Sequence, residues 1–188
     1  MDAALVRAME LFWRHGYEGT SLSDLTEAMG INRPSLYAAF GSKEQLFRKA
    51  LDLYCERYLT TEVVLAEPTA RAVVERMLAE TVRLNTGAST PQGCLGTNGA
   101  IVCSPENESI RQELIARRAE VQEQLRKRLQ KAKASGDLPA DANVADLASY
   151  VMIVTRGIAV QAASGVPREE LRRVADLALR GWPTPRHE

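Results

Sequence analysis

Hydroxyl-bearing and cationic side chains gather near the N-terminus, in the stretch from Gly30 to Glu44. The planar guanidinium of Arg33 can bind the edge of a guanine base or pair with a phosphate. The hydroxyls of Ser35 and Tyr37 can donate hydrogen bonds to phosphate oxygens. These residue types, so close together, predict contacts with double-stranded DNA.

Neighbouring residues extend this candidate surface. Ala38 is small enough for close approach or for contact with a thymine methyl group. Lys43 lies at an expected helix start, where free N–H groups and the helix dipole favour a phosphate. Another helix is expected to start just after Thr20 and Ser21. The expected DNA-contacting residues are Thr20, Ser21, Arg33, Ser35, Tyr37, Ala38 and Lys43.

The spacing around these side chains is typical of a helix-turn-helix unit. Apolar residues three and four apart predict a bracing helix over residues 22–29. Gly30 supplies a tight turn, and Pro34 suits the first turn of a reading helix that ends at Phe40. The apolar faces of both helices are expected to pack on the preceding helix, around Phe12. Such a pair places its second helix in the major groove.

The charge of the whole chain requires any DNA-binding surface to be local. Basic and acidic residues number 24 each, and the net charge is zero. A neutral protein binds DNA through a local patch. The charged residues from 33 to 49 are Arg33, Lys43, Arg48 and Lys49 against Glu44. The same residues also suit a capped helical subdomain with a solvated charged face, an alternative that they leave open.

Residues 4–50 resemble the DNA-binding domain of the tetracycline-repressor (TetR) family of transcriptional regulators. The matching residues are Leu11-Phe12, Gly16-Tyr17, Thr20-Ser21-Leu22, Leu25, Ala28, Gly30-Ile31, Leu36-Tyr37, Phe40, and Ser42-Lys43-Glu44 with Leu46. The resemblance implies an all-α fold, with a three-helix helix-turn-helix DNA-binding domain over residues 1–50. A larger helical effector-binding and dimerisation domain is expected over residues 51–188. A ligand-responsive regulator is implied, with repression favoured: a homodimer on a palindromic operator, released by a small molecule.

The rest of the chain also shows helical signals, without convincing strand alternation. Helices are expected over residues 43–60 and 70–85, from Ser104, over residues 143–163, and from Pro167. The 143–163 helix is apolar on most sides, which indicates burial on more than one face. With the last helix it suits half of a four-helix dimer interface. Burial within one subunit is the alternative.

The resemblance also implies a small-molecule effector within the helical body. Sites of this kind are mostly apolar with a few polar groups. The candidate lining residues are Met77, Thr81, Leu84, Leu95, Asn98, Ile101, Tyr150, Thr155 and Arg156. Arg156 is a single cation in an apolar helix and requires a carboxylate partner. A protein acid at the dimer seam is favoured over a ligand for that role.

Two cysteines leave a second sensing chemistry open. Cys94 follows a loop of small polar residues near an expected helix start, where a thiol pKa is lowered. Either Cys94 or Cys103 could therefore serve a redox- or electrophile-sensing regulator of the same fold. Burial of each as a small apolar side chain is the favoured alternative. An odd count of three cysteines suits a reducing cytosol.

No pattern in the sequence predicts catalysis, a metal site or a cofactor. The two histidines are His15 and His187, and neither is placed near Cys94 to form a nucleophile pair. No apolar run reaches the ~20 residues of a membrane span, so a cytoplasmic protein without a membrane partner is expected. A helical adaptor that does not bind DNA is the alternative from another class. Salt-sensitive affinity for DNA distinguishes the two.

Overall fold

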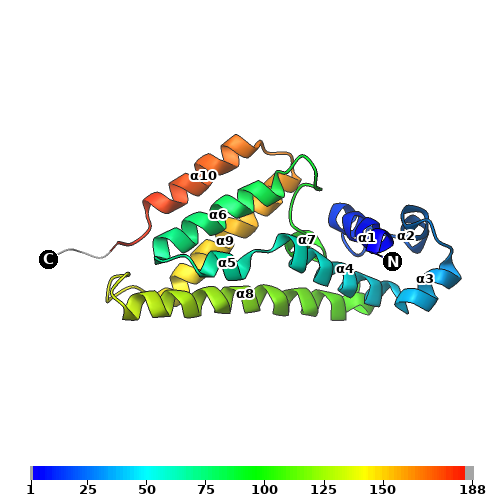
Figure 1. The fold of residues 1–188 in the computed structure, drawn as a ribbon, viewed down its shortest axis with the longest axis horizontal. Helices are drawn as coiled ribbons and strands as arrows, with labels where there is room; N and C mark the ends of the chain where they lie inside the picture. Colours follow the sequence, from blue (N-terminus) through cyan, green and yellow to red (C-terminus); the bar gives the residue numbers. More distant parts are fainter. Residues whose placement is uncertain (1, 185–188) are drawn as a thin grey trace.

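The computed structural model describes residues 2–184, and these form helices and loops without any strand. Within this range, ten α-helices and one 3-10 helix follow one another along the chain. The first four helices occupy one end of an elongated molecule, and the long α8 (Glu108–Ala134) runs along its length (Figure 1). The expected all-α fold is confirmed. His187 lies outside the described residues.

The N-terminal unit consists of α1 (Asp2–His15), α2 (Leu22–Met29), α3 (Arg33–Phe40) and α4 (Lys43–Tyr58). Side chains that accept backbone hydrogen bonds start three of these helices. Ser21 Oγ accepts from Asp24 N at 3.1 Å and Asp24 Oδ2 accepts from Ser21 N at 2.8 Å, which completes a capping box. Asn32 and Ser42 cap α3 and α4. Gly30, with φ 68°, makes the left-handed turn between α2 and α3.

The body consists of α5 (Thr61–Leu65), α6 (Ala70–Asn85), α7 (Leu95–Asn98), the 3-10 helix η1 (Pro105–Asn107), α8, α9 (Val144–Ala163) and α10 (Arg168–Arg180). Two boundaries differ from the prediction. The helix expected to reach Thr60 ends at Tyr58, because Leu59 is extended. Ser104 makes no side-chain cap for α8, and its N–H donates instead to Glu18 Oε1 at 2.7 Å.

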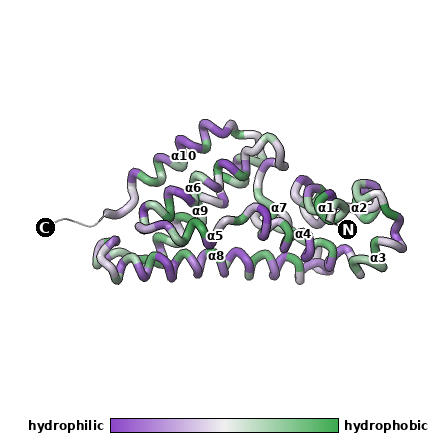
Figure 2. Tube along the Cα trace, viewed as in Figure 1, coloured by the Kyte–Doolittle hydropathy of each residue, from purple (hydrophilic) through white to green (hydrophobic). Residues whose placement is uncertain are grey.

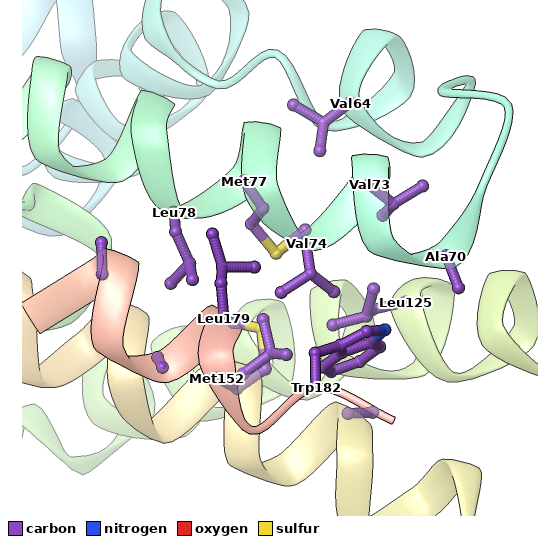
Figure 3. Packing of buried hydrophobic residues seen from close by; sticks show 14 of the residues in the cluster. Val64, Ala70, Val73, Val74, Met77, Leu78, Leu125, Met152, Leu179 and Trp182 are labelled. Atoms are coloured by element: carbon purple, nitrogen blue, oxygen red, sulfur yellow. The ribbon is translucent and has the colours of Figure 1, made fainter. Parts of the chain in front are cut away.

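The core of the body lies between α6, α8, α9 and α10. Met77 and Leu78 of α6 face Met152 of α9 and Leu179 of α10 (Figure 3). Hydrophilic and hydrophobic residues interchange along α8 and α10 (Figure 2), as expected for helices with one buried face. Helices α9 and α10 therefore pack on the body through their buried apolar faces.

A second core joins the N-terminal unit to the body. Phe12 of α1 and Phe47 of α4 lie edge to face at 5.0 Å between ring centroids. Leu95 of α7 and Leu114 of α8 belong to the same cluster. Because α7 and α8 contribute to this core, the N-terminal unit cannot shift without repacking against the body.

Residues 93–99, hereafter the 93–99 segment, accept one hydrogen bond from α1 and one from the turn that follows α1. Trp13 Nε1 donates to the Gly93 carbonyl at 2.8 Å in a buried contact. At the other end of the segment, Tyr17 N donates to the Gly99 carbonyl at 2.7 Å. The approach is close: a Cβ at Gly16 would lie 3.1 Å from Gly99 O. The geometry of this segment is thus set by α1.

Ion pairs add a second connection between α4 and α8. Arg48 Nε donates to Glu113 Oε2 at 2.6 Å. Arg117 Nη2 lies 2.6 Å from Asp52 Oδ1. These pairs are partly exposed, so each is worth little alone, but they fix the rotation of α4 against α8.

Helix α9 passes a test for membrane-spanning helices by length and composition alone. Its most apolar window has a mean hydropathy of 1.2, and 39% of that window is buried. The helix packs against α6, α8 and α10. Core helices of globular proteins have the same length and composition.

The Trp13 hydrogen bond provides a test of the connection between α1 and the 93–99 segment. We expect Trp13→Phe to lower the free energy of unfolding by about 1–3 kcal/mol more than Trp182→Phe, because it leaves the buried Gly93 carbonyl without its donor. Trp182 is the matched control: it is similarly buried, and its Nε1 has no hydrogen-bond partner among the described residues. Denaturant unfolding followed by circular dichroism measures both. Equal losses would contradict the expectation.

Candidate nucleic-acid interface and ligand cavity

Helix α3 has one buried face and one exposed face. Leu36 and Phe40 are buried against the rest of the N-terminal unit. The exposed residues of this helix are Arg33, Pro34, Ser35, Tyr37, Ala38 and Ala39. Tyr37 is 45% exposed despite its large aromatic ring. An exposed helix face with an arginine, hydroxyls and small side chains matches the chemistry expected for reading a DNA groove.

The guanidinium of Arg33 is held at the surface by the bracing helix. Its Nη2 donates to Ser23 Oγ of α2 at 2.9 Å. A guanidinium carries five N–H donors. This contact orients Arg33 through one of them and leaves the others available for a base or a phosphate. Sequence analysis missed Ser23, because a serine inside a short helix carries no distinguishing signal.

Lys43 begins α4 and rests on an aromatic ring. Its Nζ lies 4.3 Å from the centroid of the Tyr17 ring, a cation–π contact. Burial against this surface lowers the pKa of Lys43, while the nearby carboxylates of Glu18 and Asp24 oppose the shift. The ammonium group is therefore held close to the N-terminus of α4, where a phosphate is also favoured.

The local excess of positive charge is smaller than the sequence suggested. Arg48 is neutralised by Glu44 at 2.7 Å and by Glu113 at 2.6 Å. Lys49 is exposed, with its Nζ 5.4 Å from the centroid of the Phe40 ring. Of the four expected cations, Arg33, Lys43 and Lys49 thus remain without an acidic partner among the described residues.

The structure removes Thr20 from the accessible side chains. Thr20 is 0% exposed, and its Oγ1 donates to the Gly16 carbonyl at 2.7 Å. Its hydroxyl therefore stabilises the turn after α1 and cannot reach DNA in this conformation. Ser21 is exposed and caps α2 as expected.

A cavity of about 680 Å³ opens in the body between α4, α5, α6, α8 and α9. Five of the candidate lining residues are part of its wall: Met77, Thr81, Leu84, Thr155 and Arg156. A cavity of this size lies within the usual range for small-molecule sites. Its other walls include Leu51, Asn85, Leu114, Arg118 and Met152.

Four of the candidate lining residues lie outside this wall. Leu95 is fully buried in the core shared with the N-terminal unit. Asn98 ends the short helix α7. Ile101 is 55% exposed, because the loop after α7 turns outward. Tyr150 lies on the outer side of α9, where its hydroxyl donates to the Ala178 carbonyl at 3.3 Å.

Within the described residues of one protomer, Arg156 has no acidic partner, and an acid at the dimer seam stays a prediction. Its Nη2 donates to the backbone carbonyl of Arg118 at 3.1 Å, and its buried Nε has no hydrogen-bond partner among the described residues. Desolvation by burial lowers the pKa of Arg156. Sequence analysis missed Arg118 and Asn85 of the same wall, because α8 is rich in charge along its whole length and Asn85 resembles an ordinary helix end.

The cysteines differ in their surroundings. Cys94 lines the cavity, and its Sγ accepts a hydrogen bond from the Tyr54 hydroxyl at 3.2 Å. Cys55 also lines the cavity, and burial raises the pKa of its thiol. Burial likewise raises the pKa of Cys103, which lies near Glu18 outside the cavity wall. All three thiols are free. Across residues 2–184, no group of three or more histidines, cysteines or acids could hold a metal ion.

Two family models match this chain. Residues 4–50 match the model for bacterial regulatory proteins of the tetR family. Residues 70–177 match the model for the tetracyclin repressor-like C-terminal domain. Both parts of the expected architecture therefore have a counterpart in one family.

Individual relatives agree with the family models. The HTH-type transcriptional repressor ComR of Escherichia coli is 36% identical over 185 residues, which are 97% of this chain and 88% of ComR. A cysteine mutant of the TetR family transcriptional regulator CifR, solved with 26bp double-strand operator DNA, is 47% identical with a TM-score of 0.93, covering 97% of this chain and 96% of CifR. A putative TetR regulator from Rhodococcus sp. RHA1 is 49% identical with a TM-score of 0.67, covering 98% of this chain and 100% of that one. The chain belongs to the TetR family of helix-turn-helix transcriptional regulators, which are not enzymes.

Proposed function

We propose that this TetR family member is a cytoplasmic repressor that binds a palindromic operator as a homodimer and is released by a small molecule. Residues 1–50 would bind DNA, and residues 51–188 would bind the effector and dimerise. One observation carries the DNA-binding role: α3 buries Leu36 and Phe40 and leaves Arg33, Ser35 and Tyr37 exposed. CifR, which is 47% identical to this chain, was solved with operator DNA, and this supports a DNA-binding role here.

Each exposed residue has a distinct role in this proposal. Arg33, oriented by Ser23, reads a base edge, and Ala38 permits close approach to the groove. Tyr37 and Ser35 donate to phosphate oxygens. Ser21 and Lys43, at the N-termini of α2 and α4, bind the flanking phosphates with the adjacent backbone N–H groups.

The outer faces of α9 and α10 support a homodimer. They expose Tyr150, Ile153 and Val160 of α9 with Val174 and Leu177 of α10. Monomeric proteins rarely leave an apolar surface of this kind in water. Gly157 lies between Ile153 and Val160, and a Cβ placed there would meet no atom within 4 Å, so the backbone of α9 is open to a second copy. A two-fold axis through these helices gives two copies of α3 for two operator half-sites.

The cavity supports the effector role, and Cys94 supports a second mode of release. Helix α4, the last helix of the N-terminal unit, forms part of the cavity wall. The 93–99 segment, which contacts α1, forms another part of it. A thiol-sensing regulator would use Cys94, whose Sγ both lines this cavity and accepts the Tyr54 hydrogen bond. Cys94→Ser would then abolish release from DNA by an oxidant or electrophile, whereas unchanged release removes this alternative.

Operator contacts can be separated by type. We expect Arg33→Ala to cost about 1–3 kcal/mol of operator binding and to relax the preference at one base pair, because a base contact is lost. Lys43→Ala, which removes a phosphate contact, should weaken binding to all sequences and reduce the salt slope by about one. Fluorescence anisotropy with the DNA next to the gene, at several salt concentrations, measures both.

Arg57→Ala is the matched control, since Arg57 is an exposed arginine at the far end of α4. It should bind like the unchanged protein. If the unchanged protein bound this DNA no better than random sequence, and neither Arg33→Ala nor Lys43→Ala changed the affinity, the protein would be a helical adaptor and not an operator-binding repressor.

The dimer interface gives a second test. We expect Ile153→Glu together with Leu177→Glu to produce a folded monomer that has lost operator binding, because a charge placed in an apolar interface is costly. Val102→Glu is the control: Val102 is also an exposed apolar residue, at 80%, but it lies in the loop after α7. Sedimentation and circular dichroism report assembly and folding. A dimer that persists in the double variant would place the interface elsewhere.

A further inference from the structure

Two arginines that have no carboxylate partner among the described residues line the cavity. Arg118 of α8 and Arg156 of α9 both line the cavity, and the carbonyl of Arg118 accepts from Arg156 Nη2. Neither guanidinium lies within ion-pair distance of an acid among the described residues. The contrast with the preceding residue is direct: Arg117 pairs with Asp52 at 2.6 Å and with Glu113 at 2.9 Å.

The surroundings of these two arginines disfavour their positive charge. Burial lowers the pKa of both arginines, and the proximity of Arg156 lowers that of Arg118 further. An arginine does not lose its proton under ordinary conditions, so the two positive charges stay and repel each other. Partly buried charges normally have a partner, and an anion between these guanidinium groups would supply it.

Hydrogen bonding in the same wall is also incomplete. Asn85 is only 2% exposed, and its Oδ1 has no hydrogen-bond partner among the described residues, although its Nδ2 donates to the Thr81 carbonyl at 2.6 Å. The Nε of Arg156 is buried and unpartnered as well. Buried polar atoms are rarely left in this state. The two residues that carry these unpartnered atoms, Asn85 of α6 and Arg156 of α9, both contribute to the wall of the cavity.

The acids of the cavity wall lie where water compensates their charge. Glu56, Glu62 and Glu120 are exposed, and Glu80 pairs with Arg83 at 2.7 Å. The remaining wall is apolar and includes Leu84, Leu114, Met77 and Met152, the last two on facing helices (Figure 3). The wall therefore offers a cationic site beside an apolar surface. The acids near solvent disfavour a ligand that carries more than one negative charge.

We propose that the effector is a small monocarboxylic acid with an apolar body, whose carboxylate binds between Arg118 and Arg156. This inference rests on the proposed function and names the ligand class of its cavity. A guanidinium matches a carboxylate in geometry and charge. The apolar body would pack on Met77, Leu84 and Met152.

The same contact connects the ligand to the DNA-binding unit. Arg118 Nη1 donates to the carbonyls of Gly96 and Thr97 at 3.3 and 3.1 Å. A carboxylate that binds Arg118 competes with these carbonyls and loosens α7. The end of the 93–99 segment accepts from Tyr17 N at 2.7 Å, so the change in α7 reaches the turn that follows α1. Release of operator DNA follows from the exchange of these hydrogen bonds.

The test uses matched acids and amides on the full-length protein. Octanoate, benzoate and phenylacetate are compared with octanamide, benzamide and phenylacetamide, and phenylphosphonate tests whether a phosphonate replaces the carboxylate. We expect at least one acid to raise the melting temperature and to release operator DNA, while its amide and phenylphosphonate do neither. The inference is overturned if no acid acts, if an amide acts equally, or if phenylphosphonate binds more tightly than the acids.

Variants of the arginines identify the site. Arg156→Met should weaken the active acid by at least about tenfold, which is about 1.4 kcal/mol. Arg118→Met should weaken the acid at least as much and should also weaken operator binding without ligand, because it removes the donor to the Gly96 and Thr97 carbonyls. The control is Arg126→Met. Arg126 lies on α8, as Arg118 does, but its guanidinium pairs with Glu123 at 2.7 Å on the surface. Unchanged acid binding in both cavity variants overturns the inference. If the unchanged protein failed to bind operator at all, the proposed function would fail instead, so the two failures are distinguishable.

Discussion

The 93–99 segment is the constraint on which the rest of the structure depends. Its first carbonyl accepts from Trp13, its last accepts from Tyr17, and its middle carbonyls accept from Arg118. One short segment thus contacts α1 on one side and the cavity wall on the other. Because backbone carbonyls are obligatory acceptors, the segment cannot move away from either side without leaving buried groups unpaired. Cavity and N-terminal unit therefore share one boundary.

Charge pairing divides the molecule into two regimes. Along the surface of α4 and α8, arginines such as Arg48 and Arg111 bind neighbouring glutamates, and these contacts raise the pKa of each guanidinium. Inside the cavity the opposite holds, because Arg118 and Arg156 lose hydration without gaining an acid. The surface ion pairs orient α4 against α8. The two cavity arginines, in contrast, have positive charges that no acid among the described residues neutralises. A fold with zero net charge can thus hold a strongly cationic site.

Local chemistry explains which predictions succeeded. The bounds of α2 and α3 were predicted closely because Ser21, Gly30 and Pro34 act on their own backbone. Thr20 failed because its neighbour Ser21 is the cap, while its own hydroxyl donates back to Gly16 in the turn. That choice depends on how α1 ends, which helix patterns do not encode.

The cavity was only partly predictable for a related reason. Residues on the inner faces of α6 and α9, such as Met77 and Thr155, follow from helical spacing. Arg118 does not, since α8 carries arginines on several faces and only packing decides which one is buried. Ile101 and Tyr150 were expected in the wall, but a loop turned the first outward and the rotation of α9 turned the second away. Sequence periodicity locates a buried face and does not say which neighbour covers it.

Gly157 has a consequence for how such a regulator could diverge. A Cβ added there meets no atom within 4 Å in its own protomer, so packing within the single chain does not require glycine at this position. In the proposed dimer, the same atom would separate the two α9 helices and thereby the two copies of α3. A mutation at this position would then alter which spacing of half-sites is recognised, while every base-contacting residue stays the same. The choice of operator would then change through the distance between the two copies of α3, set by a residue that does not contact DNA.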